Sequence, residues 1–240
     1  MKYFLTSSPC IYGQRAFNPK NQFIDELLRQ IPSKCHATFI CSDPHRYDFN
    51  DHIANDMLVC FKQIGIDFIS FHVIDDRNYN KCEQLILNSD LLIFAGGHVP
   101  TQNAFFQKIN LKEILKHYDN VIMGISAGSM NCSKLIYAIP EACGEANDIN
   151  YQRFIPGLNI TDTMIIPHYN LLKGTYVDTY LLFEEIAIPD SLNHRFYTLM
   201  DGSYIYGDGI TEEVRGECYL IENQNMKLLI KDEEIYQIKS

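Results

Sequence analysis

The strongest constraint on the fold is an alternation between short apolar runs and longer segments with helical periodicity. In the first half of the chain, the apolar runs lie at residues 3–6, 37–41, 68–73, 91–94 and 121–125, and helical patterns lie at 20–31, 51–64, 79–88 and 102–118. Short apolar strands that alternate with helices are typical of a parallel sheet with helices on both faces. We therefore predict an α/β fold of three layers, α/β/α, around a mostly parallel sheet.

The pattern changes in the last third of the chain. Further strands are predicted at 163–167 and 196–200, with a helix near 174–187 between them. After Asp201, short apolar runs follow one another between turns rich in Gly, Asp and Asn, at 204–206, 217–221, 227–230 and 235–238. Such spacing predicts antiparallel hairpins at the C-terminus. Since no repeat or linker divides the chain, we expect a single domain over residues 1–240.

Charge and cysteine usage exclude several classes of protein. The chain has 20 basic and 30 acidic residues, a net charge of −10, and no Lys/Arg cluster that could follow a phosphate backbone. Nucleic acid and anionic membranes are therefore not expected as partners. The apolar stretch at the N-terminus is too short for a signal peptide, and no run approaches the ~18 residues of a membrane span, so we expect a cytoplasmic protein. The eight cysteines form no CxxC pair and are expected to be mostly buried thiols.

The most informative junction for function lies at Ser126. The apolar run at 121–125 stops there and passes into small residues that can begin a helix, which we expect over 127–137. On a tight turn from a strand to a helix, a serine hydroxyl stands clear of the sheet, and the next N–H group, that of Ala127, points to where a carbonyl oxygen would become negative. Ser126 is thus a candidate nucleophile and Ala127 a candidate oxyanion donor. The alternative is a Gly-rich turn that only packs a helix onto the sheet.

A serine nucleophile needs a base, and the base needs an orienting carboxylate. His168 follows the predicted strand at 163–167, and Asp201 follows the one at 196–200, so both are expected at the same sheet edge as Ser126. We assign His168 as the base and Asp201 as the acid. The alternatives are a structural histidine at a strand end and a simple Asp-Gly turn.

Another strand end carries candidate binding residues. Gly97, after the run at 91–94, allows the backbone to approach a substrate closely, and its N–H is a second candidate for the oxyanion hole. His98, Thr101 and Gln102 would then face the substrate pocket, unless Thr101 simply caps the next helix. The sequence contains no HExxH motif, clustered Cys/His ligands, P-loop or GxGxxG fingerprint, so we expect neither a metal nor a nucleotide cofactor.

Taken together, four segments resemble peptidase family S51, which includes dipeptidase E and cyanophycinase. These segments are Gly96-Gly97, residues 124–130, Pro167-His168-Tyr169 and Asp201-Gly202-Ser203, and the resemblance spans about residues 1–210. It implies a flavodoxin-like fold similar to that of class I glutamine amidotransferases. It also implies a hydrolase with Ser126 as nucleophile, His168 as base and Asp201 as acid, which cleaves small peptides through an acyl-enzyme.

The chain departs from the family pattern at two places. His98 stands where dipeptidase E has Asn, followed by an apparent insertion at Val99-Pro100, and Lys173 is only a candidate for the basic residue that holds an acidic N-terminal side chain. An amidotransferase would need cysteine at position 126, where this chain has serine. The resemblance therefore implies the hydrolytic residues and leaves the acidic preference open.

Two other functions remain as alternatives. An esterase of the α/β-hydrolase type would place the acid before a histidine far down the chain, whereas His168 follows Ser126 closely. A non-catalytic binding module would keep the fold and the pocket without turnover. The expected partner is a small peptide; a homodimer is compatible with the sequence, although no segment identifies its interface.

Overall fold

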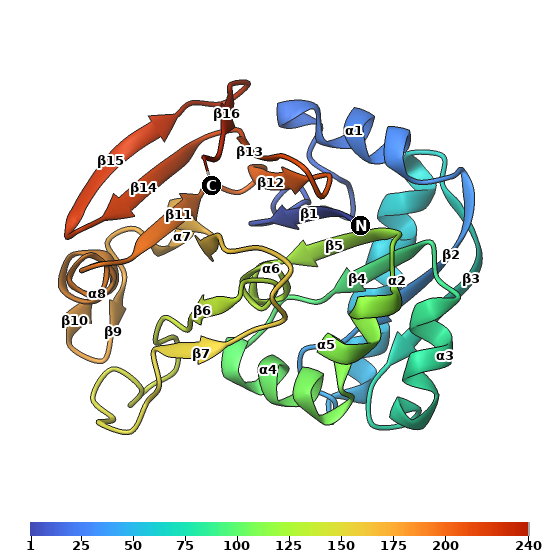
Figure 1. The fold of residues 1–240 in the computed structure, drawn as a ribbon, viewed down its shortest axis with the longest axis horizontal. Helices are drawn as coiled ribbons and strands as arrows, with labels where there is room; N and C mark the ends of the chain where they lie inside the picture. Colours follow the sequence, from blue (N-terminus) through green and yellow to red (C-terminus); the bar gives the residue numbers. More distant parts are fainter. Residues whose placement is uncertain (240) are drawn as a thin grey trace.

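Five parallel strands from the first half of the chain form one side of an eight-stranded sheet (Figure 1). The computed structural model describes residues 1–239. The five strands are β1 (Lys2–Thr6), β2 (Lys34–Ile40), β3 (Asp67–Ile74), β4 (Leu91–Phe94) and β5 (Val121–Ile125). The sheet has the order β16-β13-β12-β1-β5-β4-β2-β3, in which β12 (Tyr204–Gly207), β13 (Glu212–Arg215) and β16 (Ile235–Gln237) are each antiparallel to a neighbour. The predicted α/β fold with a mostly parallel sheet and antiparallel C-terminal strands is confirmed.

Helices cover both faces of this sheet. One face carries α1 (Phe23–Gln30) and α2 (Tyr47–Gln63), and the other carries α3 (Cys82–Leu87), α4 (Val99–Lys108) and α5 (Leu111–Ile114), with the 3₁₀ turns η1 (Lys20–Gln22), η2 (Tyr79–Lys81) and η3 (Leu115–His117) beside them. Successive residues of β1 point to opposite faces: Phe4 packs in the cluster with Phe61 of α2, and Leu5 in the cluster with Phe105 of α4. None of the helices within residues 1–239 is long and apolar enough to span a bilayer.

A second, four-stranded sheet lies beside the first, on the left of Figure 1. Its order is β15 (Asn225–Ile230), β14 (Cys218–Glu222), β11 (Arg195–Leu199) and β8 (Met164–Ile166), and only the pair of β8 with β11 is parallel. A third apolar cluster packs against this sheet. Short elements surround it: α6 (Ala127–Met130), the pair β6 (Leu135–Tyr137) and β7 (Phe154–Pro156), α7 (Tyr169–Leu172), the pair β9 (Tyr176–Val177) and β10 (Tyr180–Leu181), the π-helix η4 (Leu182–Ala187) and α8 (Ile188–Asp190).

Two predicted helices are wrong in extent. The helix expected over 127–137 ends at Met130, because Asn131 donates its side-chain amide to Val99 O and Gln102 Oε1 and the chain then enters β6. Cys132 therefore lies after that helix and not inside it, and it is fully buried. The helix expected near 174–187 begins only at residue 182, because Gly174 and Asp178 adopt positive φ angles of 75° and 55° and form the turns around β9 and β10.

Two further differences from the prediction concern an interrupted helix and a strand of mostly charged residues. The helical pattern at 102–118 is interrupted after Ile109, because Asn110 adopts the left-handed conformation with φ of 54°. Strand β13 was not predicted from the sequence, since its residues Glu212–Arg215 are mostly charged and lack the apolar pattern of a strand. All eight cysteines lie within residues 1–239 and are free thiols; six are buried, as expected, whereas Cys10 is half-buried and Cys143 is exposed.

Candidate active site

Ser126 occupies a strained turn between β5 and α6. Its φ of 51° and ψ of −112° lie outside the regions that non-glycine residues commonly adopt. The backbone N–H of Ser126 donates to Thr6 O at 3.0 Å and to Ser7 O at 3.1 Å, which fixes the turn against the end of β1. Gly128 is required here because a Cβ at that position would lie 2.3 Å from Phe94 O. Ser126 thus lies on a sharp turn from a strand to a helix, which is the backbone geometry that the sequence predicts.

His168 and Asp201 are joined at the ends of the neighbouring parallel strands β8 and β11. These strands belong to the second sheet, so the expectation that both residues lie at the edge of the sheet of Ser126 is wrong. The distance from His168 Nδ1 to Asp201 Oδ1 is 2.7 Å, and both side chains are largely buried. Burial by itself would raise the pKa of Asp201, but the hydrogen bond and charge of His168, with further bonds from Asn170 and Ser7, hold that pKa below its usual value. Asp201 is therefore an ionised acceptor, so His168 Nδ1–H donates to it, and this bond selects the tautomer of the neutral imidazole that has its lone pair on Nε2.

Two residues that sequence reasoning missed organise this pair. Ser7 is fully buried; its Oγ donates to Asp201 Oδ1 at 2.8 Å and accepts the backbone N–H of His168 at 2.7 Å, while its carbonyl accepts from Ser126. Asn170 donates to Asp201 Oδ2 at 3.1 Å and accepts the N–H of Asp201 at 2.9 Å. Ser7 follows β1, so the rule that sites gather at carboxyl strand ends could have found it.

The side chains of Ser126, the candidate nucleophile, and His168, the candidate base, are not hydrogen-bonded to each other in the described part of the chain. Within residues 1–239, neither Ser126 Oγ nor His168 Nε2 takes part in a hydrogen bond. Both residues nevertheless bond to Ser7, His168 through its backbone N–H and Ser126 through its own. In substrate-free sites such bonds are often long and tighten only when substrate binds.

The N–H groups of Gly97 and Ala127 are unpaired within the described part of the chain. They lie after the adjacent strands β4 and β5, which pair from Leu91 with Val121 to Phe94 with Gly124. Gly97 has a φ of 152°, and a Cβ there would lie 2.1 Å from Ser42 Oγ, so the position requires glycine. Two free donors at neighbouring strand ends fit the predicted oxyanion hole.

The residues predicted to bind substrate lie in three different surroundings: His98 and Thr101 contact each other, Gln102 is buried, and Lys173 is exposed. His98 Nδ1 lies 2.8 Å from Thr101 Oγ1, and His98 Nε2 lies 2.8 Å from Glu145 Oε1. Gln102 is completely buried and donates to Ala95 O at 2.7 Å, so the prediction that it lines the pocket is wrong. Its amide holds the backbone just before Gly97. Lys173 is exposed, with Nζ 5.8 Å from the centre of the Tyr169 ring.

The loop between β6 and β7, residues 138–153, carries three carboxylates that follow the Ser126 segment and are alternative candidates for the acid: Glu141, Glu145 and Asp148. Glu145 accepts from His98 and from the backbone N–H groups of Glu141 and Ala142; these bonds hold its pKa below the usual value although burial acts the other way. Asp148 accepts the N–H of Asn150. Neither carboxylate bonds to His168. His98, with Nε2 engaged by Glu145, is in turn not free to act as the base.

Glu141 differs from its neighbours in that loop. Burial of its carboxyl raises its pKa to about 7; nearby Glu145 adds to the rise, and His98 and His168 oppose it. The group thus belongs to the same charged surroundings as the two histidines. Within residues 1–239 no group of three or more His, Cys, Asp or Glu side chains is arranged to hold a metal ion.

Comparison with known proteins identifies the family to which this chain is similar. The sequence profile of Peptidase family S51 matches residues 3–211. Among solved structures, a peptidase from an acI-B1 Actinobacterium superposes with a TM-score of 0.70 at 13% identity, covering 99% of this chain and 96% of that one. A protein described as a candidate peptidase E from Listeria monocytogenes EGD-e gives 0.61 at 15% identity, covering 95% of this chain and 98% of that one. No curated protein sequence matches this chain.

Proposed function

Because this chain belongs to peptidase family S51 and is a serine peptidase, we propose that it hydrolyses peptide bonds of small peptides through an acyl-enzyme on Ser126. The observation that carries the proposal is the 2.7 Å bond from His168 to Asp201 at the edge of the second sheet, which Ser7 connects to the Ser126 turn of the first sheet. A histidine held by an ionised carboxylate, beside a strained serine, is the arrangement that serine hydrolysis needs.

The proposed reaction has two stages, formation of the acyl-enzyme and its hydrolysis, and His168 transfers a proton in both. His168 Nε2 accepts the proton of Ser126 Oγ as that oxygen bonds to the carbonyl carbon, and the N–H groups of Gly97 and Ala127 stabilise the resulting oxyanion. His168 then gives the proton to the leaving amine as the peptide C–N bond breaks. Water deprotonated by His168 attacks the acyl-enzyme, and the proton returns to Ser126 as the acid product leaves.

The β6–β7 loop supports the preference for small peptides. Its Glu145 is bonded to His98, directly after Gly97, and Asp178 accepts the N–H groups of Gly144 at 2.7 Å and Ala146 at 3.1 Å. The loop is thus held by hydrogen bonds to His98 and to Asp178, and it borders the site beside the N–H groups of Gly97 and Ala127. We infer that this limits the length of chain that the site accepts.

A set of dipeptides, with casein as a long polypeptide substrate, tests the proposal. The parent protein should release amino acids from dipeptides, and Ser126→Ala should lower kcat by about 10⁴-fold or more. Ser33→Ala is the matched control, since Ser33 is exposed and its hydroxyl makes no hydrogen bond within residues 1–239. Cleavage of casein at internal bonds without dipeptide turnover would contradict the assignment of small peptides.

A further inference from the structure

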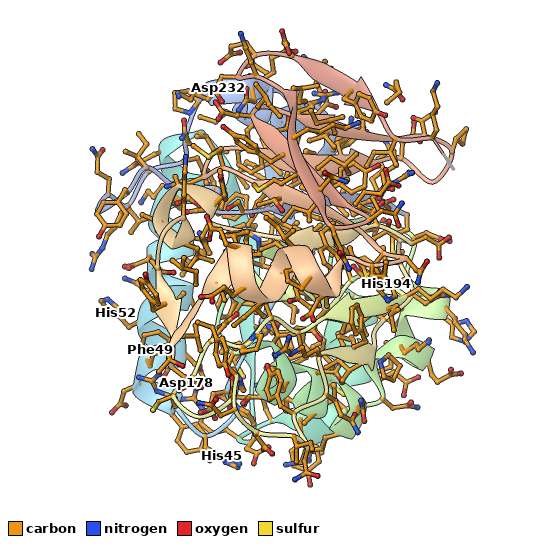
Figure 2. The ribbon with its side chains drawn as sticks, turned by 90° about the vertical axis from the view of Figure 1, so that its left-hand side faces the viewer. His45, Phe49, His52, Asp178, His194 and Asp232 are labelled. Atoms are coloured by element: carbon orange, nitrogen blue, oxygen red, sulfur yellow. The ribbon has the colours of Figure 1, made fainter. Side chains whose placement is uncertain are left out.

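A small cavity adjoins the end of β4, where Gly97 lies. Its lining does not include Ser126, His168 or Asp201. Its volume is about 120 Å³, and its wall is formed by Gly96, Gly97 and His98 on one side and by the start of α2 on the other. A Cβ at Gly96 would lie 3.5 Å from Ser126 Cβ, so this wall touches the nucleophile. Figure 2 labels Phe49, one of the lining residues, on α2. The volume equals roughly that of four water molecules, enough for one side chain.

The cavity lies on the side of Ser126 away from the base. In the sheet, β4 and β2 follow β5 on one side, and β1 lies on the other, where Ser7 bonds to His168 and Asp201. The base must protonate the leaving amine, so the leaving group lies on the His168 side. The acyl part of the substrate, with the side chain of its last residue, is then directed toward β4 and β2, where the cavity is.

Polar groups without partners line this cavity. Ser42 is 8% exposed and its Oγ makes no hydrogen bond to any residue in 1–239. Asn50 is 4% exposed; its Nδ2 donates to Asp43 O at 2.9 Å, and its Oδ1 accepts no bond from the described residues. Both oxygens remain accessible to solvent, so they can form hydrogen bonds to a polar ligand in the cavity.

Two opposite charges stand at the mouth of the cavity without pairing. Arg46 and Asp43 both line it, yet within residues 1–239 the Arg46 guanidinium has no carboxylate within 4.0 Å and lies 4.3 Å from the Phe49 ring centre. One oxygen of Asp43 accepts the N–H of His45 at 3.0 Å, and its carboxylate has no cationic side chain within 4.0 Å. The cavity thus offers one free donor group and one free acceptor group.

A carboxamide matches this pair of charges better than a charged side chain does. Its oxygen can accept from Arg46 while its NH₂ donates to Asp43. A carboxylate would meet Asp43, and an ammonium or guanidinium would meet Arg46, with like charges close together at the mouth. We propose that this cavity binds the side chain on the amino side of the scissile bond and selects Asn or Gln there. The inference rests on the proposed function for its place in the substrate.

The test compares dipeptides that differ only in the first residue: Asn, Gln, Asp, Glu, Lys and Ala, each followed by Ala. For the parent protein, kcat/KM for Asn or Gln should exceed that for Ala by about tenfold to 100-fold, since hydrogen bonds to charged groups contribute about 1.5–3 kcal/mol. Asp, Glu and Lys should fall below Asn and Gln. A parent that cleaves acidic or basic first residues faster than amides overturns the inference.

Two variants separate the roles of the charges. Asp43→Asn removes the negative charge and should raise the ratio of Asp over Asn cleavage about tenfold, whereas Arg46→Gln should raise the ratio of Lys over Asn cleavage instead. Asp48→Asn and Lys62→Gln are the matched controls on α2, exposed and outside the cavity. If Asp43→Asn and Arg46→Gln shift these ratios no more than the controls do, the cavity does not select by charge and the inference is wrong.

Binding to the Ser126→Ala variant keeps the inference distinct from the proposed function. Calorimetry with Asn-Ala, Asp-Ala and Lys-Ala should give the tightest binding for Asn-Ala. If the parent cleaves no peptide but the variant binds Asn-Ala selectively, the proposed function fails and the cavity assignment stands. If the parent cleaves peptides but neither rate nor binding depends on the first residue, the proposed function stands and the cavity assignment fails.

Discussion

Ser7 Oγ and Asp201 Oδ1 lie 2.8 Å apart although 194 positions separate them in the sequence. The same hydroxyl accepts the backbone N–H of His168, so one buried serine at the end of β1 holds both members of the histidine–carboxylate pair. Its carbonyl bonds to the turn of Ser126. The first strand of the chain therefore aligns residues supplied by three later strands.

Ser7→Ala should impair catalysis more than substrate binding. Loss of the hydroxyl removes one bond to Asp201 and leaves the N–H of His168 without its acceptor, so we expect kcat to fall about tenfold to 100-fold with little change in KM. The unfolding free energy should fall by about 1–3 kcal/mol, the cost of a buried donor without a partner. Ser8→Ala is the control, because Ser8 Oγ makes only a 3.4 Å bond to Cys10 O. Equal loss of kcat in both variants would contradict a specific role for Ser7.

Asp201→Asn should reduce kcat by about 10³-fold to 10⁴-fold, because an amide favours the wrong histidine tautomer. Glu141→Gln and Asp148→Asn, measured on the same dipeptide, are the comparison, since neither side chain bonds to His168. Should a loop variant lose activity while Asp201→Asn keeps it, the orienting carboxylate belongs to the β6–β7 loop.

Glu141 should make stability depend on pH. Its carboxyl has a pKa of 4.5 in the reference state and about 7 in the folded protein, so the fold favours the protonated form. The unfolded chain therefore loses this proton first, and the contribution of Glu141 to stability decreases as the pH rises from about 4.5 to about 7. The residue as a whole is exposed, which limits the effect.

Thermal unfolding of the parent and Glu141→Gln at pH 5 and pH 8 measures this dependence. The glutamine variant should have nearly the Tm of the parent at pH 5 and a higher Tm at pH 8. A Tm difference between the two proteins that is the same at both pH values would show that the Glu141 carboxyl titrates normally.

Gly128→Ala should destabilise the protein strongly. The added Cβ would lie 2.3 Å from the carbonyl oxygen of Phe94, a backbone atom that cannot move without disturbing β4. Overpacking of this kind costs about 1–3 kcal/mol or more. Gly96→Ala is the control for stability, since its nearest neighbours would be at 3.5 Å and its φ is ordinary. Urea unfolding of the two variants should give a large loss for the first and a small one for the second.

The parallel half of the fold could be predicted from the sequence because each buried strand there reads as a continuous apolar run. Residues 91–94 and 121–125 match β4 and β5 without shift. The elements after Ser126 could not be predicted as well, because tertiary contacts determine them. Asn131 ends α6 through bonds to α4, and Asp178 bends the chain and holds the β6–β7 loop.

The candidate site shows the same division. Ser126, His168 and Asp201 follow apolar runs and were visible at strand ends, whereas Ser7 and Asn170 are ordinary polar residues whose role depends on contacts across the chain. The sequence predicts Gln102 in the pocket together with His98 and Thr101, but helical geometry turns it inward to Ala95. The position of a residue around the helix determines the direction of its side chain, and a short sequence motif does not give that position.

The most direct test of the central claim is covalent labelling by a fluorophosphonate, followed by peptide mass spectrometry to locate the adduct. Ser126 should carry the label, because it lies on the strained turn after β5 beside two free N–H groups. Labelling should disappear in Ser126→Ala and slow sharply in His168→Ala, which removes the base. Label on another serine, or no label on a protein that cleaves dipeptides, would contradict the assignment of Ser126 as the nucleophile.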